Sequence, residues 1–204
     1  NFGYEPAKAA IDASLKRLDT TYIDLLLLHQ PFADYYGAYR ALEEAYKAGK
    51  VRAIGVSNFS PDRLIDIGLF NEVFPMVNQV ETHVFNQQIK AKTYMDKYHC
   101  QIESWGPFAE GRHDFFNNPT LVEVGEGYHQ TAAQVALRYL IQRGIVVIPK
   151  STHKERMEQN FAVFDFELNE NDMAKILALD EGTSQFFDHT QPETVELFAK
   201  WIKG

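Results

Sequence analysis

The strongest constraint on the fold is a repeated alternation of short apolar runs with amphipathic, helix-spaced segments. Residues 22–28 are almost continuously apolar, which is typical of a parallel strand buried on both faces. Further strand-sized runs lie at 51–56, 76–80, 101–105 and 145–149. Because strands and helices alternate, the sequence predicts an α/β fold with a parallel sheet and right-handed crossovers.

Helix ends are marked by residues with specific backbone preferences. Ser60 and Thr131 stand where N-caps are expected, and Gly49 and Gly144 stand where helices should end. Residues 106–119 form a longer polar loop, and loops of this length are often functional. The predicted helices cover residues 6–18, 36–48, a segment opening at 60–63, 87–98, 132–143, 153–161 and 169–179, with a short terminal helix after 191.

Two architectures fit this alternation: a doubly wound open sheet and a (β/α)8 barrel. No glycine-rich fingerprint follows any predicted strand, which counts against a dinucleotide-binding open sheet. Polar residues gather instead at the carboxyl ends of the strands, where a barrel carries its active site. These pairs are His29-Gln30, Ser57-Asn58, Glu81-Thr82, Gly106-Pro107 and Lys150-Ser151. The barrel is the better interpretation.

Composition narrows the function classes. With 20 Lys and Arg against 28 Asp and Glu, the net charge of −8 argues against nucleic-acid binding, although a small basic pocket for one anion remains compatible. No apolar run approaches the length of a membrane span, and no metal-ligand motif stands out. The single cysteine, Cys100, favours a reducing compartment, and we expect a cytoplasmic protein. We treat residues 1–204 as a single domain.

Five segments, in order, resemble the aldo-keto reductases. They are residues 24–31 (DLLLLHQP), 49–59 (GKVRAIGVSNF), 77–81 (VNQVE), 105–107 (WGP) and 148–151 (IPKS), the last followed by Arg156 and Asn160. The Trp-Gly-Pro version resembles the branch that includes the diketogluconate reductases. The resemblance implies a (β/α)8 barrel that reduces an aldehyde or ketone by hydride transfer from NADPH.

The resemblance also implies an active-site tetrad of Asp, Tyr, Lys and His. His29 matches the histidine that orients the substrate carbonyl, and an imidazole at a strand end suits that role. The other three members are expected upstream of residue 1, at earlier strands. The chain then corresponds to strands 4 to 8 of eight, truncated to about five strands, and would be impaired or inactive by itself.

The cofactor residues follow from the same resemblance. Ser57, Asn58 and Gln79 would hold the nicotinamide carboxamide, because amide side chains both donate and accept hydrogen bonds. Trp105 would stack on the nicotinamide ring. The adjoining Gly106, Pro107 and Phe108 begin a loop that would close over the pyrophosphate. The adenosine 2′-phosphate and adenine would be bound by Lys150, Ser151, Thr152, Arg156, Gln159 and Asn160.

Each assignment has an ordinary structural alternative. His29 could cap a strand, Ser57-Asn58 could begin a turn, and Trp105 could be a core residue. Cations around residue 153 could simply be solvated, but they oppose the dipole of the helix that begins there, and a bound phosphate would explain them. A second function is an NADPH-binding or regulatory protein of the same lineage without efficient turnover. In either case, a missing N-terminal segment or a partner copy is expected to cover the sheet edges at 22–28 and 145–149.

Overall fold

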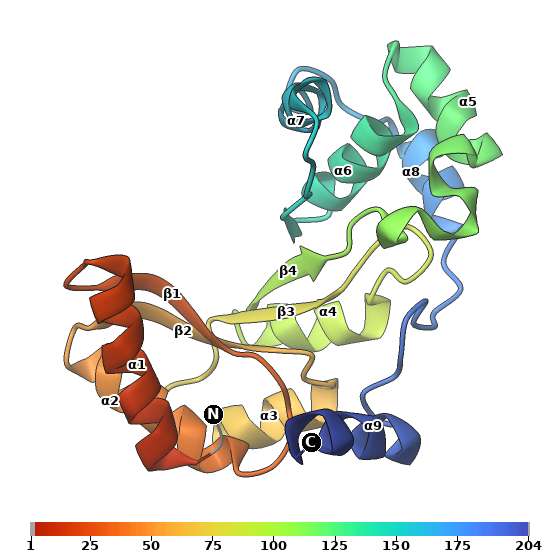
Figure 1. Ribbon diagram of the computed structural model, residues 1–204. Helices are drawn as coiled ribbons and strands as arrows, with labels where there is room; N and C mark the ends of the chain where they lie inside the picture. Colours follow the sequence, from red (N-terminus) through yellow and green to blue (C-terminus); the bar gives the residue numbers. More distant parts are fainter. Residues whose placement is uncertain (1–2, 204) are drawn as a thin grey trace. The chain divides into compact units, whose positions relative to one another are not determined.

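The computed structural model describes residues 3–203 and shows an α/β fold built on a five-stranded sheet (Figure 1). The strands pair in chain order, β1-β2-β3-β4-β5, and the register is parallel between β1 and β2, β2 and β3, and β4 and β5. The predicted α/β class with a parallel sheet is confirmed. The strands are β1 (Ile23–Leu28), β2 (Val51–Ser57), β3 (Val77–Glu81), β4 (Gln101–Trp105) and β5 (Val146–Val147).

Helices separate the strands largely where end signals predicted them. Thr131 caps its helix with a reciprocal capping box to Gln134, and Asn169 caps another through the backbone N–H of Asp172. One helix was not predicted, although Asn118 and Pro119 supply a good N-cap and first position for it. The helices are α1 (Tyr4–Leu18), α2 (Tyr35–Lys47), α3 (Pro61–Leu69), α4 (Ile89–Lys97), α5 (Pro119–Tyr128), α6 (Ala132–Gln142), α7 (Lys154–Phe161), α8 (Glu170–Leu177) and α9 (Pro192–Lys203), with a 3₁₀ segment η1 (Ala109–Asn117).

The chain forms two compact units, which we describe separately. Of the described residues, unit 1 comprises 3–79, 90–101 and 188–203, and unit 2 comprises 80–89 and 102–187. The interpretation of residues 1–204 as a single domain stays a prediction. No helix within residues 3–203 is long and apolar enough to cross a membrane.

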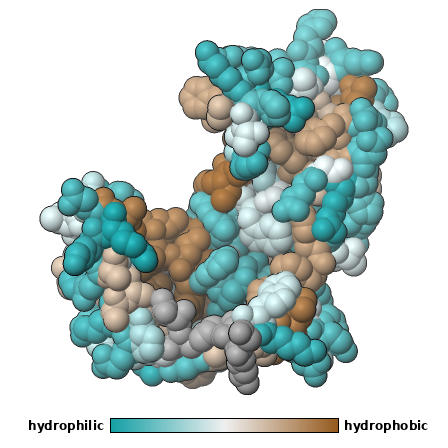
Figure 2. Space-filling view, in the orientation of Figure 1, coloured by the Kyte–Doolittle hydropathy of each residue, from teal (hydrophilic) through white to brown (hydrophobic). Residues whose placement is uncertain are grey.

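In unit 1, β1 and β2 lie side by side and α1 packs against α2 (Figure 1). Gly55 in β2 is required by packing, because a Cβ there would overlap the Val77 carbonyl oxygen of the neighbouring strand. The prediction that residues 22–28 are buried on both faces is wrong, since Leu25–Leu28 are only half-buried. Strand β1 lies at one edge of the sheet, and among residues 3–203 its only strand neighbour is β2. Figure 2 shows hydrophobic surface over β1 and β2.

In unit 2, α6 contributes fully buried residues such as Val135, Leu137 and Leu140 to the core. The last strand is shorter than the predicted 145–149 and covers only Val146–Val147. Within the described part of the chain its only strand neighbour is β4, and Pro149 lacks the N–H that a longer ladder would use. Val146 is 44% exposed, so this sheet edge also carries accessible apolar surface.

Candidate functional site

Four residues predicted to act together meet at the carboxyl ends of β1, β2 and β3 in unit 1. The Asn58 side-chain amide reaches the His29 backbone carbonyl at 3.4 Å and the Ser57 hydroxyl oxygen at 3.2 Å. The Ser57 hydroxyl in turn donates to the Gln79 carbonyl at 3.0 Å. His29 is exposed and Ser57 is buried. The strand ends therefore bring this part of the predicted set together.

Asn58 holds an uncommon backbone conformation at this position. Its φ is +62°, a region in which asparagine is among the few non-glycine residues at ease. Its backbone N–H donates to the Gln79 carbonyl at 2.9 Å, which fixes the turn out of β2. The turn therefore fixes where the Asn58 side chain leaves the strand end, beside the Ser57 hydroxyl.

The end of β4 in unit 2 carries an aromatic pair. The ring centroids of Trp105 and Phe186 lie 5.2 Å apart, with the planes tilted by 54°. Gly106 follows with φ +63°, and a Cβ added there would lie 3.8 Å from the Phe186 ring. Pro107 is buried directly after it. Trp105 thus stands at a strand end, only partly buried, rather than within the core.

The loop after Pro107 has an unusual density of left-handed residues. Ala109, Glu110, His113 and Asp114 all have φ between +48° and +55°, and Gly111 has φ +78°. The residues 106–119 predicted as a polar loop therefore contain the irregular 3₁₀ segment η1. An aromatic cluster stabilises this segment, since the ring centroids of Phe108, Phe115 and Phe116 lie 5.4 to 5.8 Å apart.

A cavity of about 500 Å³ in unit 2 gathers most of the predicted phosphate and adenine residues. Its walls come from the η1 loop, the start of α6, and the segment that leads from β5 into α7. Seven of its lining residues were predicted from sequence: Phe108, Lys150, Ser151, Thr152, Arg156, Gln159 and Asn160. Five were outside the predicted set: Phe116, Thr131, Ala132, Ala133 and His153.

The missed lining residues had only a weak signal in the sequence. Thr131 was recognised as a helix cap, and nothing in its pattern distinguishes a cap facing a cavity from one facing solvent. Ala132 and Ala133 contribute surface but no distinctive chemistry. Whether Ala132 and Ala133 line the cavity depends on how α6 packs, and the spacing of residues along the chain does not determine that packing.

The cavity carries two positively charged side chains that could bind an anion. Lys150 and Arg156 line it, and within residues 3–203 neither forms an ion pair or a hydrogen bond. Lys154, by contrast, lies 3.7 Å from Glu158. The N-cap His153 of α7 makes no side-chain capping hydrogen bond. Two unpaired cations beside a helix N-terminus are unfavourable by themselves, and a bound phosphate would satisfy both the cations and the helix.

The polar groups suit an organic phosphate ligand better than a metal ion. Among residues 3–203 there is no cluster of three or more His, Cys, Asp or Glu side chains that could hold a metal. The cavity combines cations, hydroxyls and carboxamides with the aromatic faces of Phe108 and Phe116. Hydroxyls and amides hydrogen-bond a heterocycle, and aromatic rings stack on it.

Comparison with known proteins decides the family. The profile of the Aldo/keto reductase family matches residues 2–181. The chain belongs to the aldo/keto reductase family. A glyoxal reductase of Bacillus subtilis (strain 168) is 43% identical over 180 residues, which are 88% of this chain and 64% of that relative. This aldo/keto reductase chain therefore spans slightly less than two thirds of the length of that relative.

Solved structures agree with the family assignment. A Gox0644 variant in complex with NADPH matches this aldo/keto reductase with a TM-score of 0.88 and 34% identity, over 93% of this chain and 70% of that one. A putative 2,5-diketo-D-gluconic acid reductase B matches with a TM-score of 0.87 and 34% identity, over 95% and 70%. The predicted family and its diketogluconate-reductase-like branch are confirmed.

Proposed function

We propose that this aldo/keto reductase chain contributes the cofactor site of an enzyme that reduces aldehydes or ketones with NADPH. The observation that carries the proposal is the cavity in unit 2, where Lys150 and Arg156 lie unpaired among hydroxyl and amide side chains. A phosphate monoester on a nucleotide is the anion that such a cavity fits, since arginine offers a planar fork and lysine a point charge. A relative solved with NADPH supports the same choice.

NADPH would supply a hydride to the carbonyl carbon. Lys150, Ser151, Thr152 and Arg156 would bind its 2′-phosphate, and Gln159 and Asn160 its adenine. Gly106, Pro107 and Phe108 would follow its pyrophosphate, and Trp105 would offer a flat face to the nicotinamide ring. Ser57, Asn58 and Gln79 would hold the carboxamide and so select the ring face that is presented.

His29 would bind and orient the carbonyl oxygen of the substrate. It is exposed directly after β1, and its backbone is tied to Asn58 of the proposed carboxamide group. A positioned donor on that oxygen lowers the barrier to hydride attack on the carbon. The proton that completes the alcohol would come from a tyrosine of the tetrad, which we expect upstream together with its Asp and Lys. General acid catalysis contributes about 10²–10⁴-fold, so turnover by this chain alone should be weak.

We further propose that the five strands are the fourth to eighth of a (β/α)8 barrel. The half-buried leucines of β1 and the 44% exposed Val146 of β5 support this, because a closed barrel would cover both edges. Either an N-terminal segment or a partner copy would supply that cover. The buried single cysteine, Cys100, fits a reducing compartment, and we propose the cytoplasm.

An NADPH-binding or regulatory role without efficient turnover is the second candidate. It rests on the same cavity in unit 2, whose cations, hydroxyls and amides suit nucleotide binding whether or not a reaction follows. The two candidates share the cofactor site and differ in the chemistry that follows binding.

One pair of measurements tests both candidates. Titration with NADPH and NADH, followed by tryptophan fluorescence, should show saturable binding that is at least about tenfold tighter for NADPH. Consumption of NADPH with simple aldehydes, including glyoxal, is then measured on a protein that also carries the upstream segment, because this chain alone should turn over weakly in either case. Turnover by that longer protein separates an enzyme from a binding protein. A chain that binds neither nucleotide would overturn the proposal as a whole.

A further inference from the structure

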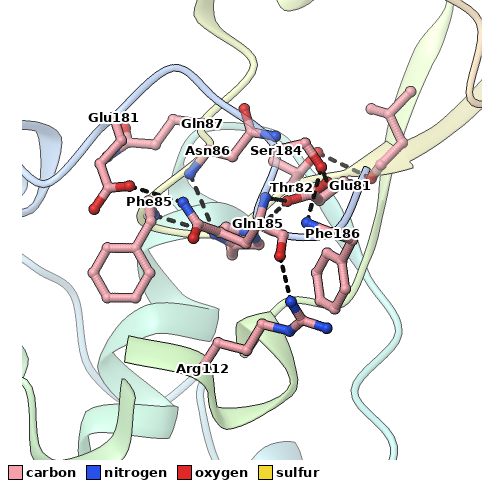
Figure 3. A network of polar contacts seen from close by, with 12 residues as sticks. Glu81, Thr82, Phe85, Asn86, Gln87, Arg112, Glu181, Ser184, Gln185 and Phe186 are labelled. Atoms are coloured by element: carbon pink, nitrogen blue, oxygen red, sulfur yellow. Dashed lines mark hydrogen bonds and ion pairs between the residues drawn. The ribbon is translucent and has the colours of Figure 1, made fainter. Parts of the chain in front are cut away.

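A buried carboxylate at the end of β3 organises the polar network drawn in Figure 3. Glu81 is 5% exposed and receives hydrogen bonds from three donors. The His83 ring nitrogen Nε2 lies 2.9 Å from Oε1, the Gln185 backbone N–H donates to Oε1 at 2.8 Å, and the Ser184 hydroxyl donates to Oε2. The carboxylate therefore joins a strand end to residues about a hundred positions later in the chain.

His83 holds the carboxylate in a fixed orientation. Its Nδ1 accepts hydrogen bonds from the backbone N–H groups of Phe85 and Asn86, each at 3.2 Å. Nδ1 must then be the unprotonated nitrogen, so the ring donates to Glu81 through Nε2. Because the ring is fully buried and held on both sides, Glu81 has little freedom to turn.

The segment that Glu81 captures, residues 184–187, is folded around one hydroxyl. The Ser184 oxygen accepts from the backbone N–H groups of Phe186 at 3.1 Å and Phe187 at 3.0 Å. The hydroxyl donates to Glu81, and the Phe187 carbonyl oxygen, 3.1 Å away, is a second acceptor within its reach. We call residues 184–187 the strap. Glu81 and Ser184 together determine where the side chain of Phe186 is placed.

Phe186 links the strap to the end of β4 through its contact with Trp105. Its ring centroid lies 5.2 Å from that of Trp105, and a Cβ added to Gly106 would lie 3.8 Å from the Phe186 ring (Figure 3 shows Phe186 beside Arg112). The residue after Glu81 holds the backbone of the same tryptophan, since the Thr82 backbone N–H donates to the Trp105 carbonyl at 3.3 Å. Backbone and side chain of Trp105 are thus both held from the region of Glu81.

We propose that Glu81 is a positioning residue that sets the indole of Trp105 through the strap and Phe186. The inference rests on the proposed function, in which Trp105 stacks on the nicotinamide ring. Glu81 does not need to touch the cofactor: it fixes the face on which the cofactor ring is stacked. Residues 184–187 therefore belong to the cofactor site even where they contact no part of the nucleotide.

The test reads Trp105 directly. The chain has two tryptophans, so Trp201→Phe leaves Trp105 as the single reporter. In that background, acrylamide quenching measures access to the indole without cofactor. Glu81→Gln, Ser184→Ala and Phe186→Leu should each raise the quenching constant about threefold, because the strap no longer covers one face of the ring. Ser184→Thr keeps the hydroxyl and should restore the parent value.

The second arm is an NADPH titration of the same proteins. We expect the three disruptive variants to bind NADPH about threefold to tenfold more weakly, in proportion to the rise in quenching. Glu126→Gln is the matched control, since this carboxylate is exposed on α5 away from the strap. Circular dichroism at the titration temperature shows which variants remain folded; Ser184→Ala and Phe186→Leu leave Glu81 in place if Glu81→Gln unfolds.

The outcomes separate the two proposals. If folded Ser184→Ala and Phe186→Leu proteins keep the parent quenching constant, the strap does not position Trp105 and the inference is wrong. If the strap variants loosen Trp105 but the parent protein binds no NADPH, the proposed function fails while the mechanical link stands. Loosening of Trp105 accompanied by weaker NADPH binding supports both.

Discussion

The guanidinium of Arg112 lies 4.4 Å from the centroid of the Phe186 ring. The same side chain donates from Nη1 to the Gln185 carbonyl at 2.6 Å. Arg112 belongs to the irregular η1 loop, while Phe186 and Gln185 belong to the strap. One side chain therefore couples the loop expected to cover the pyrophosphate to the segment that packs on Trp105.

Removing this side chain should free the loop. In Arg112→Ala we expect the dissociation rate of NADPH to rise about tenfold, because a stacked cation and a charge-assisted hydrogen bond are both lost. Arg112→Lys keeps the charge without the planar guanidinium, so its NADPH dissociation rate should lie between those of the parent and Arg112→Ala. Stopped-flow fluorescence gives the rate, with the exposed Arg17→Ala on α1 as control. Equal rates in all four proteins would show that the loop is held by other contacts.

The phosphate cavity makes a prediction about nucleotide choice. Lys150→Met and Arg156→Leu should each weaken NADPH binding about tenfold and leave NADH binding nearly unchanged, because only NADPH carries the 2′-phosphate. Lys154→Met is the matched control, since Lys154 is paired with Glu158 and does not line the cavity. Isothermal titration with both nucleotides measures the difference, and parallel losses for NADPH and NADH would contradict the assignment.

The interior of unit 2 depends on one amide. Gln87 accepts from Tyr139 Oη at 2.5 Å and Arg143 Nη1 at 3.2 Å, and donates to the carbonyls of Val84 and Ile176 at 2.8 and 2.9 Å. Gln87→Leu leaves several buried groups unsatisfied and should lower the free energy of unfolding by about 3 kcal/mol. Urea denaturation measures the loss.

A milder substitution at the same contact gives a reference for the loss of stability in Gln87→Leu. Tyr139→Phe removes one donor while Arg143 still serves the Gln87 oxygen, so about 1 kcal/mol is expected. Tyr94→Phe deletes a hydroxyl from a residue that is 38% exposed and should change the free energy of unfolding little. If Tyr94→Phe and Tyr139→Phe cost the same, the buried hydrogen bond contributes nothing specific.

The Glu81 network should give stability that depends on pH. Burial raises the pKa of the Glu81 carboxyl, but the hydrogen bonds from His83, Ser184 and the Gln185 amide outweigh burial and hold the pKa below its ordinary value of 4.5. A lowered pKa stabilises the folded state above the ordinary value and loses that contribution as the pH falls. The stability gap between parent and Glu81→Gln, about 2 kcal/mol at pH 7, should therefore shrink below pH 4.5. Urea denaturation at a series of pH values checks this, and a constant gap would contradict it.

Cys100 should be inert in the folded protein. Burial raises the pKa of its thiol to about 12, and the residue is 3% exposed. The thiolate is the reactive form, so labelling by a disulfide reagent at pH 8 should be slow and should become rapid in denaturant. Rapid labelling without denaturant would mean that unit 1 opens locally around α4.

Most of the fold followed from local signals. A capping box between Thr131 and Gln134 fixes the start of α6, and Pro61 suits the first position of α3, although the Ser60 side chain makes no capping hydrogen bond. Both preferences act within one turn. The sequence-based predictions were wrong where burial depends on neighbouring elements of the fold. The run of leucines in β1 is typical of a strand buried on both faces. Their actual burial depends on what packs on the sheet, which the run of leucines alone does not determine.

The candidate site was predictable to the extent that strand ends converge. Asn58 and Gln79 lie within hydrogen-bond distance of each other, since each follows or belongs to a strand of one parallel sheet, while their role toward a cofactor stays a prediction. Glu81 was noted as polar at a strand end, but its partner Ser184 is 103 residues away, and no spacing rule joins them. Long-range hydrogen bonds of this kind depend on tertiary packing.

The left-handed run in η1 constrains how this loop varies among relatives. At Glu110, His113 and Asp114 the backbone, more than the side chain, restricts which residue is tolerated. Glycine or asparagine should be accepted there with little cost, whereas valine or isoleucine would force the chain onto another path. A homologue carrying a β-branched residue at these positions should therefore enclose its nucleotide with a loop of different shape.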